Sequence, residues 1–150
     1  MIYKFTDKYK FLSSFYEIKL IILGREYNSV EHAYQAFKTK NLAEHEWIRN
    51  APTPEKAKSF GKKIKVRKDW DDLKYNVMLK LVRLKFKNED LRNMLIETDN
   101  EKLKENNYWH DNIWGNCTCK KCKDIEGKNW LGNILMDVRD EIKDEIDLFK

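Results

Sequence analysis

The chain of 150 residues has little proline and little glycine, two and five residues respectively. This scarcity excludes collagen-like repeats and disfavours an all-β fold, which needs many turns. Long apolar runs are absent too, since the longest aliphatic run, Leu20–Leu23, falls far short of the roughly 20 residues that span a bilayer. We therefore expect no membrane partner. Because the first residues lack the apolar core of a signal peptide, we expect a cytoplasmic protein.

Cysteine is scarce as well, and all three cysteines lie close together, at Cys117, Cys119 and Cys122. An odd number in a chain without a signal sequence indicates reduced thiols. Structural zinc takes four nitrogen or sulfur ligands, and His110 could complete a Cys₃His set. A fourth cysteine and the usual paired Cys-x-x-Cys motifs are missing, so the sequence favours no metal. We expect a loop that folds without zinc, in which the cysteines are either plain reduced residues or a redox-sensitive site.

Charge and apolar residues are both plentiful. Hydrophobic residues make up 41% and charged residues 37% of the chain, which excludes a disordered protein and suffices for one domain over residues 1–150. The net charge is +5, and residues 56–87 hold twelve Lys or Arg against three Asp. Such a basic stretch is either a set of solvated helix faces or the flank of a phosphate-bearing ligand.

Apolar periodicity predicts strands at residues 2–5 and 17–28, the second with a hairpin turn at Gly24. Helices are predicted over residues 29–40, 43–50, 53–64, 69–86, 90–97, 101–105 and 131–149. Ser29 and Thr53 are suitable N-caps. The fold class is therefore mainly α with a small N-terminal β element (α+β).

Two helices have long apolar seams. The helix over 69–86 is apolar on two sides, which predicts the central and most buried helix. The last helix has one apolar face, formed by Leu131, Ile134, Leu135, Val138, Ile142, Ile146 and Phe149. We expect these two helices to form the core under a pocket. Residues 106–129 between helices form a loop long enough to suggest a function.

Three polar residues of the helix predicted over 29–40 share one face. Glu31, Gln35 and Lys38 follow the spacing i, i+4, i+7, and their face borders an apolar stripe. They either line a pocket or form the ordinary polar edge of an amphipathic helix. A partly desolvated lysine has a lowered pKa and can act as a nucleophile. On the same helix, His32 is either a ligand contact or a hydrogen-bonded boundary residue.

Several sequence blocks together resemble one family. The blocks are FLSSFY at 11–16, SVEHAYQAFK at 29–38, VRKDW at 66–70, WGN at 114–116 and NWLGNILMDVR at 129–139. In this order and spacing the chain resembles, over nearly its whole length, the NADAR (NAD- and ADP-ribose-associated) family, which includes the YbiA-like N-glycosidases. The resemblance implies a single domain that hydrolyses the bond between ribose C1 and an exocyclic amine, without a cofactor.

The resemblance implies two substrate classes. The first is ADP-ribose attached to the amino group of guanine, so that the partners are an ADP-ribose or ribosyl-phosphate ligand and ADP-ribosylated DNA or RNA. The alternative is the ribosylamino-pyrimidine phosphates of riboflavin synthesis. A non-catalytic ADP-ribose- or NAD-binding module is the main competing class. A structural nucleic-acid-binding protein rests only on the lysine content and a pI of about 9.0. No oligomeric state is predicted.

Within this resemblance Lys38 is the expected nucleophile and Glu31 the general acid/base. A direct displacement, in which Glu31 activates water and Lys38 holds a phosphate or hydroxyl, stays open. The expected substrate contacts are Ser13, Phe15, Tyr16, His32, Gln35, Arg67, Trp70, Trp114, Gly115, Asn116, Asn129 and Gly132. Arg67 suits phosphate, the aromatic residues suit the base, and Asn129 either bonds ribose hydroxyls or holds its loop.

The chain departs from the family pattern at three places. Family members often have Asn where Ser14 stands and Asp where Asn116 stands. If that Asp carries a proton elsewhere, Asn116 cannot do so here. The cysteine-bearing insert between Asn116 and Gly127 occurs in only part of the family, and we expect it to tune substrate access.

Overall fold

A computed structural model describes all 150 residues, and the chain divides into two units. Ser13–Lys85 form the hairpin unit, named after its β-hairpin. Met1–Leu12 and Phe86–Lys150 form the terminal unit, which contains both chain ends. The fold is mainly α with a small two-stranded antiparallel sheet, as the sequence predicts. None of the helices combines the length and the apolar character needed to cross a membrane.

The hairpin of the hairpin unit consists of β1 (Glu17–Ile22) and β2 (Arg25–Ser29), which pair antiparallel. Leu23 and Gly24 form the turn, and both have positive φ, 51° and 82°. Two-residue hairpin turns favour this left-handed backbone because it matches the strand twist, and glycine adopts it without steric cost. The predicted turn at Gly24 is confirmed.

Four helices follow the hairpin: α1 (Val30–Ala36), α2 (Leu42–Arg49), α3 (Pro54–Gly61) and α4 (Trp70–Lys85). The side chains of Ser29, Asn41 and Thr53 each accept a hydrogen bond from the backbone N–H three residues later, so each caps a helix start. The predicted caps at Ser29 and Thr53 are thus confirmed. Both α1 and α3 end several residues earlier than predicted.

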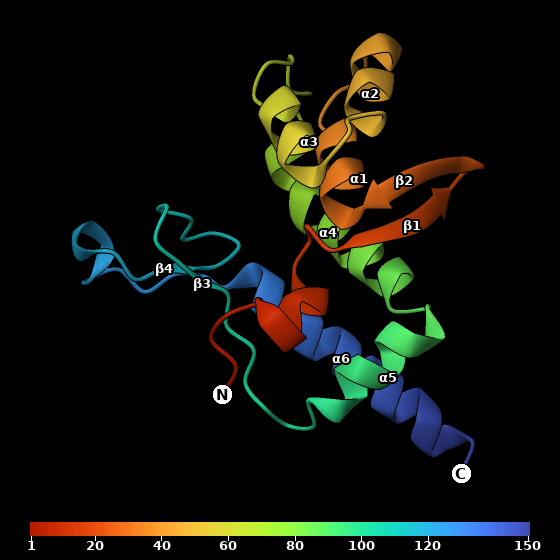
Figure 1. Cartoon of the computed structure of the whole chain (residues 1–150), viewed down its shortest axis with the longest axis vertical. Coiled ribbons are helices and arrows are strands. Elements are labelled where there is room, and N and C mark those ends of the chain that lie inside the picture. The colour runs from red at the N-terminus through yellow and green to blue at the C-terminus, as the bar shows by residue number, and fades with distance from the viewer. The chain divides into compact units, whose positions relative to one another are not determined.

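Helix α1 is the centre of the hairpin unit. It packs against both strands and against α2, α3 and α4, and all seven of its residues are buried. Figure 1 shows α1 lying between the hairpin and the helices α2 to α4. The prediction that the 69–86 helix is the most buried was wrong, because only five of the sixteen α4 residues are buried. Apolar seams on two sides did not reveal how many partners a helix meets.

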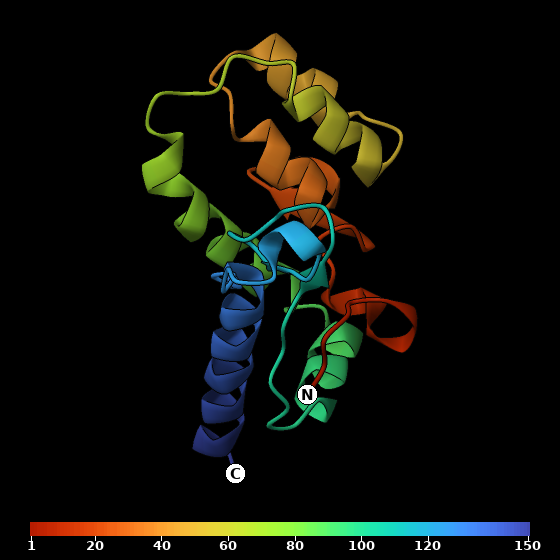
Figure 2. The same ribbon diagram turned by 90° about the vertical axis from the view of Figure 1, so that its left-hand side faces the viewer.

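The terminal unit contains a 3₁₀ helix (Asp7–Leu12), α5 (Glu89–Glu97), the short strands β3 (Asn106–Asn107) and β4 (Asn116–Cys117), a 3₁₀ turn (Lys120–Cys122) and α6 (Trp130–Leu148). Helices α5 and α6 pack together (Figure 2). The apolar face of α6 is buried from Leu131 to Ile142, as predicted. Since α4 belongs to the hairpin unit and α6 to the terminal unit, their shared core stays a prediction.

Two predicted elements of the terminal unit do not form. Residues 2–5 are not a strand and residues 101–105 are not a helix. Instead Ile2 and Leu103 form one isolated parallel bridge, in which the Ile2 N–H donates to the Lys102 carbonyl at 2.8 Å and the Lys104 N–H donates to the Ile2 carbonyl at 2.9 Å. Pairing with a distant segment has overridden the local helical preference.

Candidate functional site

Two polar side chains lie buried on α1. Glu31 and Gln35 are 7% and 4% exposed. The Gln35 Nε2 donates a hydrogen bond to Glu31 Oε1 at 2.7 Å, and the Glu31 N–H donates to the Ser14 carbonyl at 3.0 Å. Carboxylates are seldom this buried, so Glu31 is an informative exception on the central helix. Burial to this degree is not that of an ordinary solvated polar edge, and a pocket lined by this face stays a prediction.

Lys38 lies just beyond α1, because the helix ends at Ala36 and not at residue 40 as predicted. The Lys38 N–H donates to the Gln35 carbonyl at 3.2 Å, a tighter i to i+3 bond that closes the last turn. Its side chain is half-buried, with Nζ 5.5 Å from the centre of the Tyr34 ring. The structure thus keeps Lys38 near the α1 polar side chains without a continuous helix.

The surroundings shift the pKa of Lys38 downward. Burial is the main cause, because desolvation disfavours the charged amine. Glu31 opposes the shift, whereas the nearby cations Lys58, Lys74 and Lys62 add to it. A lower pKa leaves a larger share of neutral amine at ordinary pH, which is the form that attacks carbon.

Aromatic rings and a close glycine border this group. The Tyr34 and Trp70 rings lie 5.1 Å apart, so Trp70 serves as a wall beside α1. The side chain of Gln35 lies so near Gly61 that a Cβ on Gly61 would be 2.7 Å from Gln35 Cδ. Neither Gly61 nor the basic Lys58, whose Nζ is 5.7 Å from the Phe15 ring centre, was singled out from the sequence. The sequence signal for Gly61 was a glycine at the C-terminal end of a predicted helix.

The loop before the hairpin is held by Ser13 and by a buried lysine. Ser13 Oγ accepts a hydrogen bond from the Phe15 N–H at 3.1 Å, and its carbonyl accepts from the Tyr16 N–H at 3.1 Å. Lys85 Nζ donates to the same carbonyl at 2.8 Å and lies 5.5 Å from the Tyr16 ring centre. The Ser13–Tyr16 loop, predicted to bind substrate, is thereby fixed in place from α4.

Lys85 was not predicted as a site residue, yet its surroundings strongly lower its pKa. It is 2% exposed, and burial lowers its pKa to about 7. The signal for it was present in the sequence: Lys85 lies seven residues after Met78 and four after Leu81, on a buried stripe of α4. A lysine at an otherwise apolar position of a buried stripe indicates either a functional role or a buried hydrogen-bond acceptor for its amine.

His32 takes the structural one of the two roles that the sequence left open. It is 1% exposed, and its Nε2 donates to the Ala51 carbonyl at 2.9 Å. The Ser29 hydroxyl lies 2.7 Å from Nδ1, so it supplies the proton of that second bond. Both ring nitrogens are therefore engaged within the protein.

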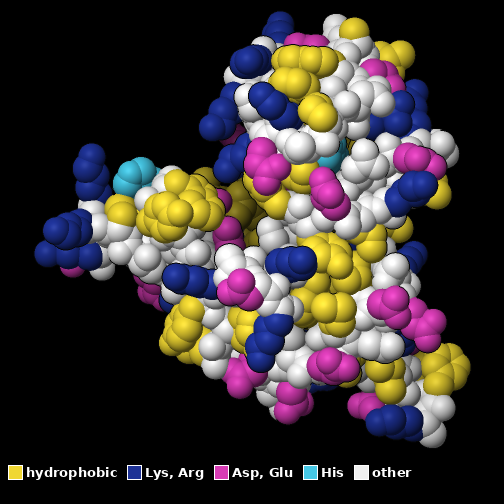
Figure 3. Space-filling model, viewed as in Figure 1, with side chains coloured by type: hydrophobic (Ala, Val, Ile, Leu, Met, Phe, Trp, Pro, Cys, Tyr) yellow, Lys and Arg dark blue, Asp and Glu magenta, His cyan; other side chains and the backbone are white.

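Arg67 forms a two-pronged ion pair with Asp69, Nε to Oδ1 at 2.6 Å and Nη2 to Oδ2 at 3.0 Å. This pairing lowers the pKa of Asp69. Both residues line an open groove of about 690 Å³ together with Thr39, Lys40, Asn41, Glu44, Lys65, Val66 and Lys68. Figure 3 shows Lys and Arg side chains gathered around α3 of the same unit. The Arg67 N–H also donates to the Lys38 carbonyl at 2.7 Å, which ties the groove to the Lys38 turn.

The predicted contacts Trp114, Gly115, Asn116, Asn129 and Gly132 all lie in the terminal unit. Asn129 has the left-handed backbone, φ 51°, and its side chain accepts from the Glu105 N–H at 3.0 Å and donates to the Leu103 carbonyl at 2.9 Å. Asn129 therefore takes the loop-holding role that the sequence left open. A Cβ on Gly132 would be 2.6 Å from Asn129 Oδ1, so the close approach of this side chain requires glycine.

The Trp114–Asn116 segment covers the start of α6. The carbonyls of Ile113, Trp114 and Gly115 accept hydrogen bonds from the first N–H groups of that helix and its cap, at 3.0–3.1 Å. These donors have no partner within a helix, so the loop supplies one. The Asn116 amide donates to Asn106 Oδ1 at 3.1 Å, and Asn116 Oδ1 accepts from the Gly127 N–H at 2.9 Å. An ionised aspartate lacks the donor that this arrangement uses.

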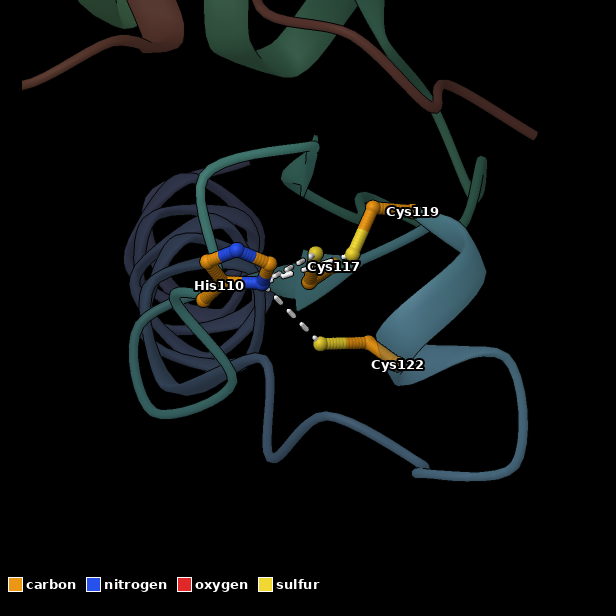
Figure 4. A group of neighbouring side chains, drawn as sticks. All are labelled: His110, Cys117, Cys119 and Cys122. Carbon is orange, nitrogen blue, oxygen red and sulfur yellow. Dashed lines mark hydrogen bonds between the residues drawn. The ribbon is translucent and has the colours of Figure 1, made fainter.

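The terminal unit also brings together the residues of the less favoured metal alternative. The ligand atoms of His110, Cys117, Cys119 and Cys122 all lie within 4.8 Å of one another (Figure 4). No disulfide links the cysteines. The hairpin unit, in turn, holds Glu31, Gln35 and Lys38 with the other predicted contacts Ser13, Phe15, Tyr16, His32, Arg67 and Trp70.

Comparison with known proteins identifies the domain family of this chain. The model of the NADAR domain matches residues 2–143, which spans both units. An N-glycosidase of Nostoc punctiforme is 36% identical over 97% of this chain and 94% of its own length. N-glycosidase YbiA of Escherichia coli is 32% identical over 93% of this chain and 86% of its own length.

Two further similarities concern function and fold. A riboflavin biosynthesis protein of Vibrio vulnificus is 32% identical over 95% of this chain, which covers 38% of that longer protein. The NMR structure of Escherichia coli YbiA superposes with a TM-score of 0.82 at 31% sequence identity, over 97% of this chain and 84% of that chain. The mainly α fold with a small sheet is therefore that of a solved relative.

Proposed function

The chain belongs to the NADAR domain family, and from that premise we propose that it removes ADP-ribose from guanine bases of nucleic acid by hydrolysing the bond between ribose C1 and the exocyclic amine. Relatives named N-glycosidase support a hydrolase acting on N-glycosyl bonds. The observation that carries the proposal is the pairing of Lys38, whose pKa is lowered, with the buried carboxylate of Glu31.

The proposed reaction uses Lys38 as a nucleophile. In the ring-opened riboside, C1 and the exocyclic nitrogen share a C=N bond. The neutral amine of Lys38 adds to C1, and one of its protons passes to the exocyclic nitrogen. The second lysine proton follows as the bond between C1 and the exocyclic nitrogen breaks, so the base leaves as its free amine and a lysine imine remains. Water then adds to the lysine imine and releases the sugar and the free amine of Lys38. One water is consumed, and one hard step becomes several easier ones.

Glu31 would move the proton in these steps. Its carboxylate is buried and held by Gln35, so its position is fixed before substrate binds. The direct route differs, because Glu31 would activate water and the Lys38 cation would only hold a phosphate or hydroxyl. The lowered pKa of Lys38 favours the imine route over a purely electrostatic role.

The groove beside the Lys38 turn supports a nucleotide-sized substrate. Its volume of about 690 Å³ falls in the range of small-molecule sites. Lys40, Lys65 and Lys68 line it and could pair with two phosphates, as ADP-ribose requires. The half-buried Phe15 ring offers a stacking surface to a base, whereas Trp70, 5% exposed, backs the site from behind Tyr34.

A second substrate class rests on a separate observation. The similarity to a riboflavin biosynthesis protein favours ribosylamino-pyrimidine phosphates, which share the C1–amine bond and carry phosphate. A module that only binds ADP-ribose is less favoured, because binding alone does not need a half-buried lysine near a buried carboxylate.

The experiment compares two substrates under the same conditions. Purified protein is incubated with a guanine-ADP-ribosylated DNA oligonucleotide and, separately, with the ribosylamino-pyrimidine phosphate, and products are identified by mass spectrometry. Free ADP-ribose and unmodified guanine are expected. Cleavage of the pyrimidine riboside alone would select the second substrate, and binding of ADP-ribose without cleavage of either would indicate the binding module.

Matched lysine variants separate chemistry from charge. Lys38→Arg keeps the charge but stays protonated, so turnover should fall by at least about 10³-fold. Lys63→Arg changes an exposed lysine of the same unit and should leave turnover unchanged. Near-normal turnover of Lys38→Arg would rule out the imine route and make Glu31, acting through water, the primary catalytic group.

A further inference from the structure

The cluster of His110, Cys117, Cys119 and Cys122 lies in the terminal unit and takes no part in the proposed chemistry. We propose that it is a structural zinc site that holds the loop between β3 and α6 together. This replaces the expectation of a metal-free loop, which rested on the missing fourth cysteine.

The ligand atoms have the spacing of a tetrahedral zinc site. His110 Nδ1 lies 3.3 Å from Cys119 Sγ, 3.5 Å from Cys122 Sγ and 3.9 Å from Cys117 Sγ. In a regular tetrahedron with Zn–S of about 2.3 Å and Zn–N of about 2.0 Å, the nitrogen and each sulfur are about 3.5 Å apart. Figure 4 shows the three cysteine side chains around the imidazole of His110, with their sulfurs turned toward Nδ1.

Hydrogen bonding alone does not account for this convergence. One imidazole nitrogen carries either one hydrogen or one lone pair, so it makes one good hydrogen bond. Three sulfurs nevertheless surround His110 Nδ1. A disulfide would use two sulfurs and leave the third and the imidazole unexplained. A metal ion engages all four atoms at once.

The loop fixes the ligands with bonds of its own. Asn107 is 2% exposed, and its side chain brackets His110: Oδ1 accepts from the Trp109 N–H at 3.3 Å and the Asp111 N–H at 3.2 Å, and Nδ2 donates to the Asp111 carbonyl at 2.8 Å. The Cys117 N–H donates to Asn112 Oδ1 at 2.8 Å. Such bonds orient ligands before the ion binds.

His110 itself has an unusual backbone. Its φ of 69° lies in the left-handed region, which is uncommon for residues other than glycine. Strain of this kind persists where the surroundings over-determine it, and four bonds to one ion would do so.

The chemistry of the ligands selects zinc. Three thiolates and one imidazole in a tetrahedral arrangement are typical of structural zinc, and no open position is left for catalysis. Binding exchanges the protons of three thiols for one Zn²⁺ and leaves a site of formal charge −1. Lys120, Lys121 and Lys123 lie in the same turn and offset that charge.

The proposed zinc site would stabilise the loop that bonds to the start of α6. Cys117 directly follows the Trp114–Asn116 segment, whose carbonyls accept hydrogen bonds from the start of α6. A zinc ion bound by Cys117, by His110 and by the 3₁₀ turn would hold the C-terminal end of the Trp114–Asn116 segment in place. Loss of the ion should therefore loosen residues 107–128 and leave α5 and the body of α6 intact.

The first experiment uses the natural chain, purified without chelator. Elemental analysis should find about one zinc per chain. Exchange for Co²⁺ should give the intense visible absorption of a tetrahedral cobalt–thiolate site, and all three cysteines should resist alkylation until a chelator is added. Less than about one tenth of a zinc per chain with no such cobalt spectrum, or a disulfide in the freshly purified protein, would overturn the proposal.

The second experiment locates the ion with matched variants. Cys119→Ser and His110→Ala each remove one ligand and should weaken zinc binding by at least about 100-fold in a chelator competition. Lys121→Ala changes an exposed, non-ligating residue of the same turn and should bind as the natural chain does. If Cys119→Ser holds zinc as tightly as Lys121→Ala, the ion lies elsewhere and the proposed site is wrong.

Discussion

Helix α1 and the loop between β3 and α6 both bury polar side chains, but they use them differently. On α1 the buried Glu31 and Gln35 bond to each other, since the helix satisfies its own backbone groups. In the loop the side-chain amides of the buried Asn107 and Asn129 form hydrogen bonds with backbone N–H and carbonyl groups.

The difference follows from backbone hydrogen bonding. Every buried N–H and carbonyl needs a partner, and an irregular loop lacks the repeating partners of a helix. Its polar side chains then serve the backbone, whereas the side chains of a central helix are available for chemistry. We therefore expect catalysis from the side chains of the α1 region and structural support from the polar side chains of the loop. Each prediction tests one side of that division.

Apart from the loss of Lys38 itself, the largest effect is expected at Glu31. Glu31→Gln keeps the size of the side chain and an oxygen for Gln35, but it removes the titratable proton carrier. Turnover should fall by about 10²–10⁴-fold while ADP-ribose binding and thermal stability are retained. Glu55→Gln makes the same change at an exposed position of α3 and should have no effect. Full activity of Glu31→Gln would remove catalysis from α1.

Truncation of the α6 seam should act on stability. Leu135 is 1% exposed, so Leu135→Ala should lower the free energy of unfolding by about 2–5 kcal/mol. Leu148→Ala is the matched control on the same helix, where the side chain is 77% exposed, and should change little. Denaturant unfolding measures both. A loss below about 0.5 kcal/mol at Leu135 would place the seam outside the core.

Removal of a loop amide tests the supporting role directly. Asn107→Ala leaves two backbone N–H groups and one carbonyl without their partner, so unfolding should become easier by about 1–3 kcal/mol. Asn93→Ala alters an exposed asparagine on α5 of the same unit and serves as the control. Unchanged stability of Asn107→Ala, measured by chemical unfolding, would show that its amide does not support the loop.

A buried lysine of α4 should shape the pH dependence of stability. The pKa of Lys85 is about 7 in the folded chain and near 10.5 when unfolded, so between these values the unfolded state binds the extra proton. Raising the pH therefore stabilises the fold over this range, by up to about 1.4 kcal/mol per pH unit.

Lys85→Met should flatten this rise and gain relative stability toward pH 7. Lys80→Met, at an exposed position of the same helix, should keep the slope of the natural chain. Part of the rise should persist in every variant that retains Lys38, because its pKa is lowered too. An unchanged slope in Lys85→Met, from urea unfolding at pH 7, 8 and 9, would mean that Lys85 is not the titrating group.

Local signals predicted the parts of the fold that local forces determine. The Gly24 turn, the Ser29 and Thr53 caps and the apolar face of α6 follow from short-range preferences, and the structure has each of them. The 101–105 helix failed because Leu103 pairs with Ile2, far away in the chain. The central place of α1 also depends on packing that no single segment reveals.

The candidate site divides in the same way. The spacing of Glu31, Gln35 and Lys38 was visible in the sequence, although the helix ends before Lys38. Lys85 was missed although it lies on a buried stripe of α4, because its hydrogen-bond partner, the Ser13 carbonyl, is far away in the chain. The structural use of His32 could not be separated from a ligand role until Ala51 was found beside its ring.

The most direct test of the account is to trap the covalent intermediate on Lys38. Borohydride added during turnover of the guanine-ADP-ribosylated substrate should reduce the imine and fix ADP-ribose to the lysine, and peptide mass spectrometry should place the adduct on Lys38. Lys38→Ala should give neither adduct nor free base. Rapid turnover by the natural chain with no adduct, or an adduct that persists in Lys38→Ala, would contradict the central role of Lys38.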